Sequence, residues 1–190
     1  MKNNAKHRFV FIDIETGGTI PDKHSLLSIG CIVWDINKGI IGEKELFIFS
    51  DKYVITKNAR KINHFDENSH NIISKDGNAV ILELLNFLYE YFDKKDLIPL
   101  IGHNVQFDIN FLKVFFKNYN RSFYKYFSHR AIDTYSVYKS LVLINKITEN
   151  INSSADAFRY FGIKVEKRHS ALGDCLATVK LYEKLLEMLK

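Results

Sequence analysis

Prolines, cysteines and long apolar runs are all scarce in this chain of 190 residues. No uninterrupted apolar segment approaches the roughly 20 residues of a membrane-spanning helix, so no membrane association is expected. The first seven residues are polar and basic and lack the apolar stretch of a secretory signal. The two cysteines, Cys31 and Cys175, both sit inside apolar runs, which is typical of buried thiols in a reducing compartment. Together these absences predict a cytoplasmic protein.

Linkers and repeats are lacking as well, because the chain has only two prolines and no stretch rich in proline, glycine and serine. With 46% hydrophobic and 26% charged residues, the composition is that of a soluble globular protein. We therefore expect a single domain over residues 8–190, preceded by a polar segment at residues 1–7. The net charge of +5 and the pI of about 9.0 suit a polyanionic partner, although many basic proteins bind no nucleic acid.

Hydrophobic spacing predicts a sheet that begins as an antiparallel meander. Residues 8–14 are apolar on both alternations, as in a strand buried on both faces. Residues 26–36 and 40–50 form two further predicted strands, joined by a tight turn near Gly39. The remaining pattern predicts helices at about 78–92, 105–117, 134–143, 154–161 and 171–189, with short strands at 97–101 and 131–133. This order indicates an α/β domain with a mixed central sheet flanked by helices.

Two carboxylates stand two residues apart at the end of the first predicted strand. Side chains at this spacing point to the same face, so Asp13 and Glu15 project together. An isolated pair of this kind is more often a solvated strand end, but the apolar run before it argues against an exposed edge. Two like charges are costly to bury so close together unless a cation lies between them. The small turn Thr16-Gly17-Gly18 that follows allows a ligand to approach the backbone.

A second polar group, Gly102–Asp108, follows the short strand at 97–101 and opens a helix. Asn104 stands where an N-cap is expected, and Asp108 lies about one turn into the helix. An acid near a helix N-terminus is favourable without any catalytic role. Taken alone, this group therefore favours a structural reading as much as a chemical one.

A third group, His169 and Asp174, stands at the start of the last predicted helix. Asp174 borders the apolar stripe of that helix, and His169 precedes it on a loop. A lone histidine in a loop is usually an ordinary surface residue, and Lys164, Lys167 and Arg168 beside it can equally form a solvated charge cluster.

The three groups gain meaning from their combination, because they supply four carboxylates and one histidine at strand-to-helix junctions. Mg²⁺ and Mn²⁺ prefer carboxylate oxygens and water as ligands. Two such ions roughly 3.5–4 Å apart can bind the attacking and the leaving oxygen in phosphodiester cleavage. A histidine with a pKa of roughly 6.5 can take a proton from the attacking water near neutral pH.

The order and spacing of these residues resemble those of the DEDDh 3′–5′ exonucleases, the DnaQ-like group within the ribonuclease H-like fold. Asp13-Ile14-Glu15-Thr16 resembles the first family motif, His103-Asn104 with Phe107-Asp108 the second, and His169-x-Ala171-x-x-Asp174 the third. The resemblance extends from Arg8 to the last helix. It implies a three-layer α/β domain that hydrolyses nucleic acid from the 3′ end.

The resemblance also implies a role for each matched residue. Asp13, Glu15, Asp108 and Asp174 would hold two divalent ions, Mg²⁺ or Mn²⁺, and His169 would be the general base. Candidate substrate-binding residues are Thr16, Gly17 and Asn104, together with His64 in the loosely matching segment Ala59–Phe65. Attack by water would release a nucleoside 5′-monophosphate.

The sequence departs from the family pattern at two points. Gly17 stands where many proofreading members have a second threonine, which puts the contacts to the terminal sugar in doubt. The chain ends soon after the last motif, without the polymerase-binding extension of a full-length epsilon subunit. We therefore expect a stand-alone or minimal exonuclease domain, with a DNA polymerase subunit as a candidate partner.

Several functions remain open on the sequence alone. The main expectation is an exonuclease acting on single-stranded DNA in proofreading or repair, and the closest alternative is an exoribonuclease that trims RNA or degrades short oligoribonucleotides. A non-catalytic nucleic-acid-binding domain and an internally cutting nuclease are the other candidates. The aromatic and basic segment 121–130 suits either base stacking or packing on the core, and we expect packing.

Overall fold

The computed structural model describes residues 7–149, 151–165 and 169–190, so the expected polar N-terminal segment lies outside the described residues except for its last member. Five strands form one mixed sheet in the order β3-β2-β1-β4-β5. Their bounds are β1 Arg8–Thr16, β2 Leu26–Asp35, β3 Gly39–Phe47, β4 Ile98–Gly102 and β5 Phe127–Asp133. The first three strands are antiparallel neighbours, whereas β4 runs parallel to β1 and β5 runs parallel to β4.

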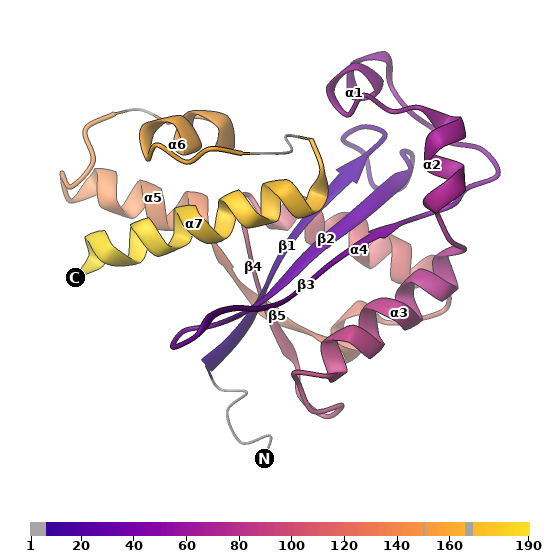
Figure 1. The fold of residues 1–190 in the computed structure, drawn as a ribbon, viewed down its shortest axis with the longest axis horizontal. Coiled ribbons are helices and arrows are strands. Elements are labelled where there is room, and N and C mark those ends of the chain that lie inside the picture. The colour runs from indigo at the N-terminus through magenta and orange to yellow at the C-terminus, as the bar shows by residue number, and fades with distance from the viewer. Residues whose placement is uncertain (1–6, 150, 166–168) are drawn as a thin grey trace.

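Helices cover both faces of this sheet (Figure 1). Their bounds are α1 Lys57–Ile62, α2 Glu67–Ile73, α3 Gly77–Tyr89, α4 Gln106–Asn118, α5 Thr134–Leu143, α6 Ser154–Tyr160 and α7 Ala171–Leu189, with a 3-10 turn η2 at Phe123–Lys125. Helices α3 and α4 pack on one face and α7 crosses the other, with α5 and α6 packed against α7. The fold is the predicted three-layer α/β arrangement, and it is consistent with the ribonuclease H-like class.

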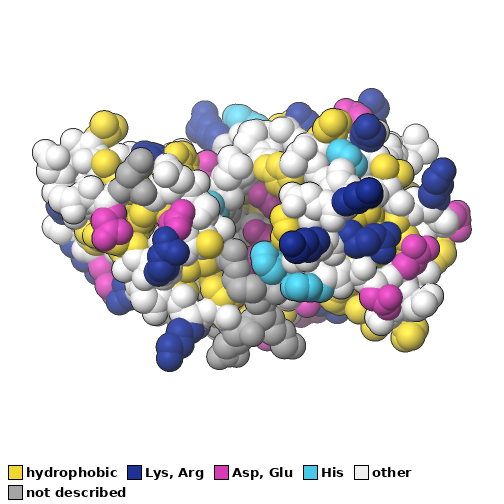
Figure 2. Space-filling model, turned by 90° about the horizontal axis from the view of Figure 1, so that it is seen from above, with side chains coloured by type: hydrophobic (Ala, Val, Ile, Leu, Met, Phe, Trp, Pro, Cys, Tyr) yellow, Lys and Arg dark blue, Asp and Glu magenta, His cyan; other side chains and the backbone are white. Residues whose placement is uncertain are grey.

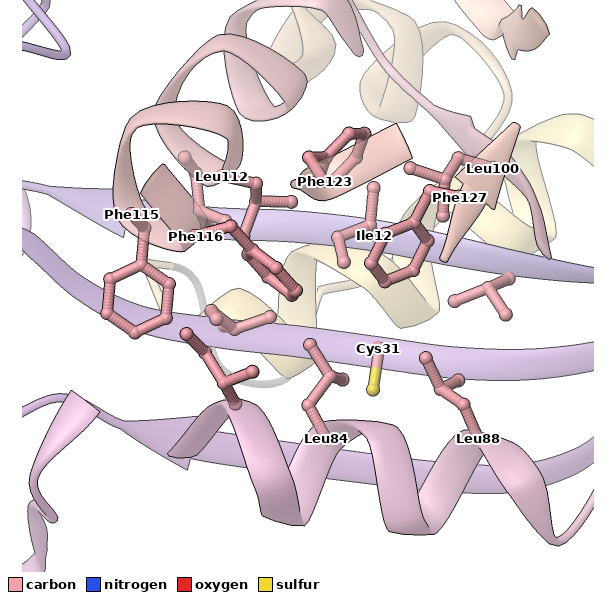
Figure 3. Packing of buried hydrophobic residues seen from close by; sticks show 14 of the residues in the cluster. Ile12, Cys31, Leu84, Leu88, Leu100, Leu112, Phe115, Phe116, Phe123 and Phe127 are labelled. Atoms are coloured by element: carbon pink, nitrogen blue, oxygen red, sulfur yellow. The ribbon is translucent and has the colours of Figure 1, made fainter. Parts of the chain in front are cut away.

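The alternation of side chains along β1 decides which face of the sheet Asp13 and Glu15 point to. Ile12 and Ile14 lie in the largest core cluster, beneath α3 and α4 (Figure 3). Phe11 points to the other face, where its ring lies 6.0 Å from that of Trp34 and 5.6 Å from that of Tyr182 on α7. Because side chains alternate along a strand, Asp13 and Glu15 continue the Phe11 face. The two acids are therefore directed toward the α7 side of the sheet.

Most predicted elements are confirmed, with the differences at their ends. The last helix and the helix at 134–143 have the predicted bounds. Strand β5 is longer than predicted, because it begins at Phe127, which pairs with Ile98 of β4. The segment 121–130 packs on the core as expected, through η2 and the first half of β5. Phe123 and Phe127 stack there with ring centroids 4.6 Å apart.

The two short helices α1 and α2 carry little apolar patterning, and neither was predicted. Helix α1 buries none of its residues, and α2 buries only His70. Capping residues are the signal that was present: Thr56 accepts a hydrogen bond from the amide of Ala59, and Asp66 accepts one from the amide of Ser69. Caps at this spacing mark helix starts independently of hydrophobic periodicity.

The buried thiols are confirmed as well. Cys31 lies in the cluster beneath α3 and α4, whereas Cys175 lies in the cluster beneath α7, so the sheet separates the two. Across the described part of the chain, every helix is too short or too polar to cross a lipid bilayer.

Candidate active site

The end of β1 carries the first pair of acids. Strand β1 pairs with β4 through Val10 and Phe11, so the last residues of β1 extend beyond their parallel neighbour. Asp13 and Glu15 stand on this extension and are half-buried. Their partner strand is β2, which pairs through Gly30 and Ser28.

The first turn of α7 brings the third acid to the same place. Ser170 is the N-cap of α7, and its hydroxyl accepts a hydrogen bond from the amide of Gly173 at 3.3 Å. Asp174 follows in the first turn and is half-buried. One carboxylate oxygen from each of Asp13, Glu15 and Asp174 lies within 4.8 Å of the others. Among the described residues, this group of acids has a geometry that could hold a metal ion.

Asp108, the fourth predicted ligand, comes from α4, the helix that packs on the other face of the sheet. It lies in the first turn of α4 and is 5% exposed. Burial raises the pKa of its carboxyl well above the usual value, and the carboxylates of Glu15 and Asp133 raise that pKa further. Hydrogen bonds from the backbone amides of Asp108 and Ile14 act in the opposite direction. These interactions place Asp108 beside the end of β1, in an environment where a cation would favour the ionised carboxylate.

His169 precedes the N-cap of α7 and has a left-handed backbone, with φ of 62°. Its ring lies 6.3 Å, centroid to centroid, from the ring of His64, which follows α1 and is also left-handed, with φ of 47°. A left-handed conformation is uncommon for histidine, and such conformations gather at functional sites. The two histidines therefore stand together, one just after α1 and the other just before the N-cap of α7. The neighbouring Lys167 and Arg168 fall outside the described residues.

Asn104 does not cap α4, so that prediction is wrong. The N-cap is Val105, which makes no capping hydrogen bond, and Asn104 has a left-handed backbone with φ of 57°. An N-cap residue is normally extended. The amide of Asn104 instead donates to the carboxylate of Asp133 at 2.9 Å. The side chain of Asn104 is exposed.

Asp133 is a site residue that sequence analysis missed. It ends β5 and caps α5, where its carboxylate accepts from the amide of Tyr135 at 3.0 Å as well as from Asn104. The adjacent Thr134 contacts the ring of His103 at 3.0 Å. Burial lowers the pKa of His103, although the charge of Asp133 opposes this. An acid directly before a predicted helix was the available signal, and it indicates a cap as readily as a site.

Thr16 and Gly17 form the turn beside the acids. The Thr16 hydroxyl donates to the carbonyl of Gly18 at 2.7 Å, and the Thr16 carbonyl accepts from the Asn63 side chain at 3.0 Å. The Gly17 amide donates to Ser25, and its carbonyl accepts from Thr56, both at 2.7 Å. A Cβ at Gly17 would lie 2.2 Å from the carbonyl oxygen of Val54. This crowding explains why glycine, and not threonine, occupies the position.

The donor set fits a hard divalent cation. Its atoms are carboxylate oxygens, which Mg²⁺ and Mn²⁺ prefer, and it contains no thiolate. Viewed from the end of the sheet where β1 finishes, acidic side chains lie in a central hollow with histidine and basic side chains beside it (Figure 2). This end of the molecule therefore combines acidic side chains with positive charge close by.

Comparison with known proteins agrees with this arrangement. The exonuclease family (RNase_T) matches residues 10–182. Among solved structures, Escherichia coli Exonuclease I in complex with a dT13 oligonucleotide is similar, with a TM-score of 0.78, 17% identity, and coverage of 94% of this chain and 40% of that one. The zinc-bound form of the Exonuclease I complex with single-stranded DNA has a TM-score of 0.76 and 18% identity. That match covers 96% of this chain and 42% of the other. Cell-death related nuclease 4 (CRN-4) has a TM-score of 0.74 and 13% identity, and the match covers 96% of this chain and 64% of that one.

No curated protein matches this chain significantly. The chain spans less than half the length of the Exonuclease I chains and just under two thirds of CRN-4. The family match nonetheless covers most of the sequence, including all three motifs. The chain belongs to the exonuclease family, as a DEDDh-type, DnaQ-like member with the ribonuclease H-like fold.

Proposed function

We propose that this protein removes nucleotides one at a time from the 3′ end of single-stranded DNA and releases nucleoside 5′-monophosphates. The observation that carries the proposal is the meeting of Asp13, Glu15 and Asp174 within 4.8 Å, on segments from opposite ends of the chain. Asp108, on α4 and close enough to Glu15 for the two charges to interact, completes the set of four acids. Two divalent ions, Mg²⁺ or Mn²⁺, when bound there would stabilise the attacking and the leaving oxygen of the phosphodiester.

The residues of the chain supply the remaining steps. His169 takes a proton from the attacking water, whose oxygen forms a bond to the terminal phosphorus. The bond from that phosphorus to the 3′ oxygen of the preceding nucleotide breaks, and this oxygen leaves with a proton from solvent. Thr16, Gly17, Asn104 and His64 surround the terminal nucleotide. Because both backbone groups of Gly17 are already hydrogen-bonded within the protein, we assign Gly17 a role in shaping the pocket.

The rim formed by α1 suits a nucleic acid strand. Lys57, Arg60 and Lys61 are exposed on this helix, and Asn63 ties its C-terminal end to Thr16 by the 3.0 Å hydrogen bond. Positive side chains near the site attract phosphates, and such attraction weakens as salt rises. A strand that enters the hollow therefore passes a basic rim before its 3′ end reaches the acids.

DNA is proposed as the substrate because the similar Exonuclease I structures are complexes with DNA oligonucleotides. This choice makes proofreading or repair the setting, with a DNA polymerase subunit as a candidate partner. An exoribonuclease differs in how the pocket treats the 2′-hydroxyl, and matched oligonucleotides separate the two.

The test is a substrate panel of 5′-labelled single-stranded DNA, RNA of the same sequence, and closed circular single-stranded DNA, each with Mg²⁺, Mn²⁺ or chelator. We expect a ladder of one-nucleotide steps on linear DNA, mononucleotide product, an intact circle and no reaction with chelator. Preference for RNA would reassign the substrate. Cutting of the circle, or binding of DNA without cleavage, would contradict the proposal.

A further inference from the structure

Glu45 on β3 holds the start of α7 from the side opposite the acids. Its Oε1 accepts a hydrogen bond from the Ser170 hydroxyl at 3.0 Å and another from the Leu172 amide at 3.3 Å. Ser170 in turn accepts from the Gly173 amide. The Glu45 side chain is thus joined to the N-cap residue and to the Leu172 amide. This amide lies in the first turn of the helix, where amides have no partner within the helix and need one from elsewhere.

The sheet register shows why Glu45 and the metal site act on the same helix turn. Asp13 pairs with Gly30, and Gly30 pairs with Glu45, so the three residues form one row across β1, β2 and β3. The start of α7 lies directly over the middle of this row. A Cβ built on Gly30 would lie 2.3 Å from the carbonyl carbon of Ala171 and 2.4 Å from the amide nitrogen of Leu172. Glycine therefore allows the helix to rest on the backbone of β2.

We propose that Glu45 is a positioning residue, which fixes the first turn of α7 and thereby sets the place of Asp174 and His169. This inference rests on the proposed function, because it assigns those two residues to metal binding and proton transfer. Adjacent strands lie about 4.8 Å apart, so Glu45 stands roughly 10 Å across the sheet from Asp13. It is too distant to bind the same ion, and its effect passes through the helix.

The loop before α7 depends on the same contact. His169 directly precedes Ser170 and has the left-handed φ of 62°. A residue in that conformation keeps it only where neighbouring contacts hold it, and Glu45 supplies such a contact through the Ser170 hydroxyl. Loss of Glu45 therefore releases a metal ligand on one side of the N-cap and the proposed base on the other.

The experiment measures Mn²⁺ binding by electron paramagnetic resonance without nucleic acid, and then kcat and KM on a DNA oligonucleotide. The variants are Glu45→Ala, Glu45→Gln and Glu45→Asp, with Glu43→Ala as the matched control from the same strand. Glu43 is exposed and two residues away. The amide oxygen of Glu45→Gln can still accept both hydrogen bonds, whereas Glu45→Asp keeps the charge but shortens the reach.

For Glu45→Ala we expect a Kd for Mn²⁺ raised about 10–100-fold, as is typical when a residue that orients metal ligands is lost. Its kcat should fall by a similar factor while KM for the oligonucleotide changes less than about twofold, since no substrate contact is removed. Glu45→Gln should restore both values to within about threefold of wild type, Glu45→Asp should show a partial loss, and Glu43→Ala should match wild type.

A Glu45→Ala protein that binds Mn²⁺ within about twofold of wild type would overturn the inference and leave the proposed function standing. A wild-type protein that binds no Mn²⁺ would instead overturn the proposed function. If Glu45→Ala does not fold, the comparison of Glu45→Gln with Glu45→Asp decides. Equal Mn²⁺ affinity in those two variants would contradict the positioning role, and a weaker Glu45→Asp would support it.

Discussion

The carboxylate of Asp174, at the start of the last helix, lies within 4.8 Å of the carboxylate of Asp13, at the end of the first strand. Two acids at this distance repel each other, and in a half-buried setting that repulsion favours either a proton or a cation between them. The helix is held there by contacts with β2 and β3, so the acids are brought together by the fold itself. A divalent cation bound between these oxygens would relieve the repulsion between the two acids.

Removal of one acid should therefore separate activity from stability. In Asp174→Asn we expect cleavage of single-stranded DNA to fall by about 10²-fold or more, the scale on which a lost electrostatic group affects catalysis. The free energy of unfolding without metal should stay the same or rise, because one repulsive charge is gone. Rate measurements and denaturant titrations check the two parts. Glu187→Gln, an exposed acid near the other end of α7, is the control and should change neither.

The role of His169 is tested by two substitutions. His169→Ala should lower kcat by roughly 10²–10⁴-fold, the usual effect of losing a general base. His169→Asn should lose as much activity but fold more readily, because asparagine tolerates the left-handed φ of this position better than alanine does. Both variants should still bind Mn²⁺. Near-normal turnover in either one would exclude His169 as the base.

The raised pKa of Asp108 predicts a pH dependence of stability. The unfolded chain ionises this carboxyl near pH 4, whereas burial and the nearby acids keep it protonated to higher pH in the metal-free folded chain. The folded state then binds more protons, so the free energy of unfolding should fall as pH rises above about 4 and until the folded-state pKa is passed.

Urea unfolding between pH 4 and 8 measures this slope. Asp108→Asn should flatten it, because an amide does not titrate, and saturating Mg²⁺ should weaken it, because the cation favours the ionised carboxylate. A wild-type slope that is unchanged in Asp108→Asn would show that another group is responsible.

Gly30→Ala tests the close contact between α7 and β2. The added methyl meets the backbone of Ala171 at 2.3 Å, which only a shift of the helix can relieve. We expect a loss of about 1–3 kcal/mol in the free energy of unfolding, typical of overpacking, together with weaker Mn²⁺ binding. Gly39→Asn is the control, since a Cβ there meets nothing within 4 Å and asparagine accepts its φ of 73°.

Hydrophobic periodicity in the sequence was enough to predict the antiparallel meander and the final helix. The sequence also singled out Asp13, Glu15 and Asp174, which the structure brings together. Each motif was weak by itself, and the order and spacing of all three motifs, which resemble the family pattern, selected these acids. The sequence did not reveal α1 and α2, whose apolar patterning is weak and whose caps were the only local signal.

Glu45 and Asp133 were missed for a different reason. Each acts through a partner distant in the sequence, Glu45 through Ser170 and Asp133 through the amide of Asn104. Hydrogen bonds of this kind depend on strand register and on where a helix crosses the sheet, and neither can be read from local spacing. Asn104, whose amide donates to Asp133, has a left-handed backbone, whereas an N-cap residue is normally extended.

The most direct test of the account is an anomalous difference map from crystals soaked with Mn²⁺ and a nucleoside 5′-monophosphate. We expect manganese density between the carboxylates of Asp13 and Asp174, with a second peak nearer to Asp108 and the phosphate bound beside both. A protein that binds the nucleotide but shows no manganese at these carboxylates, or shows it elsewhere, would contradict the account.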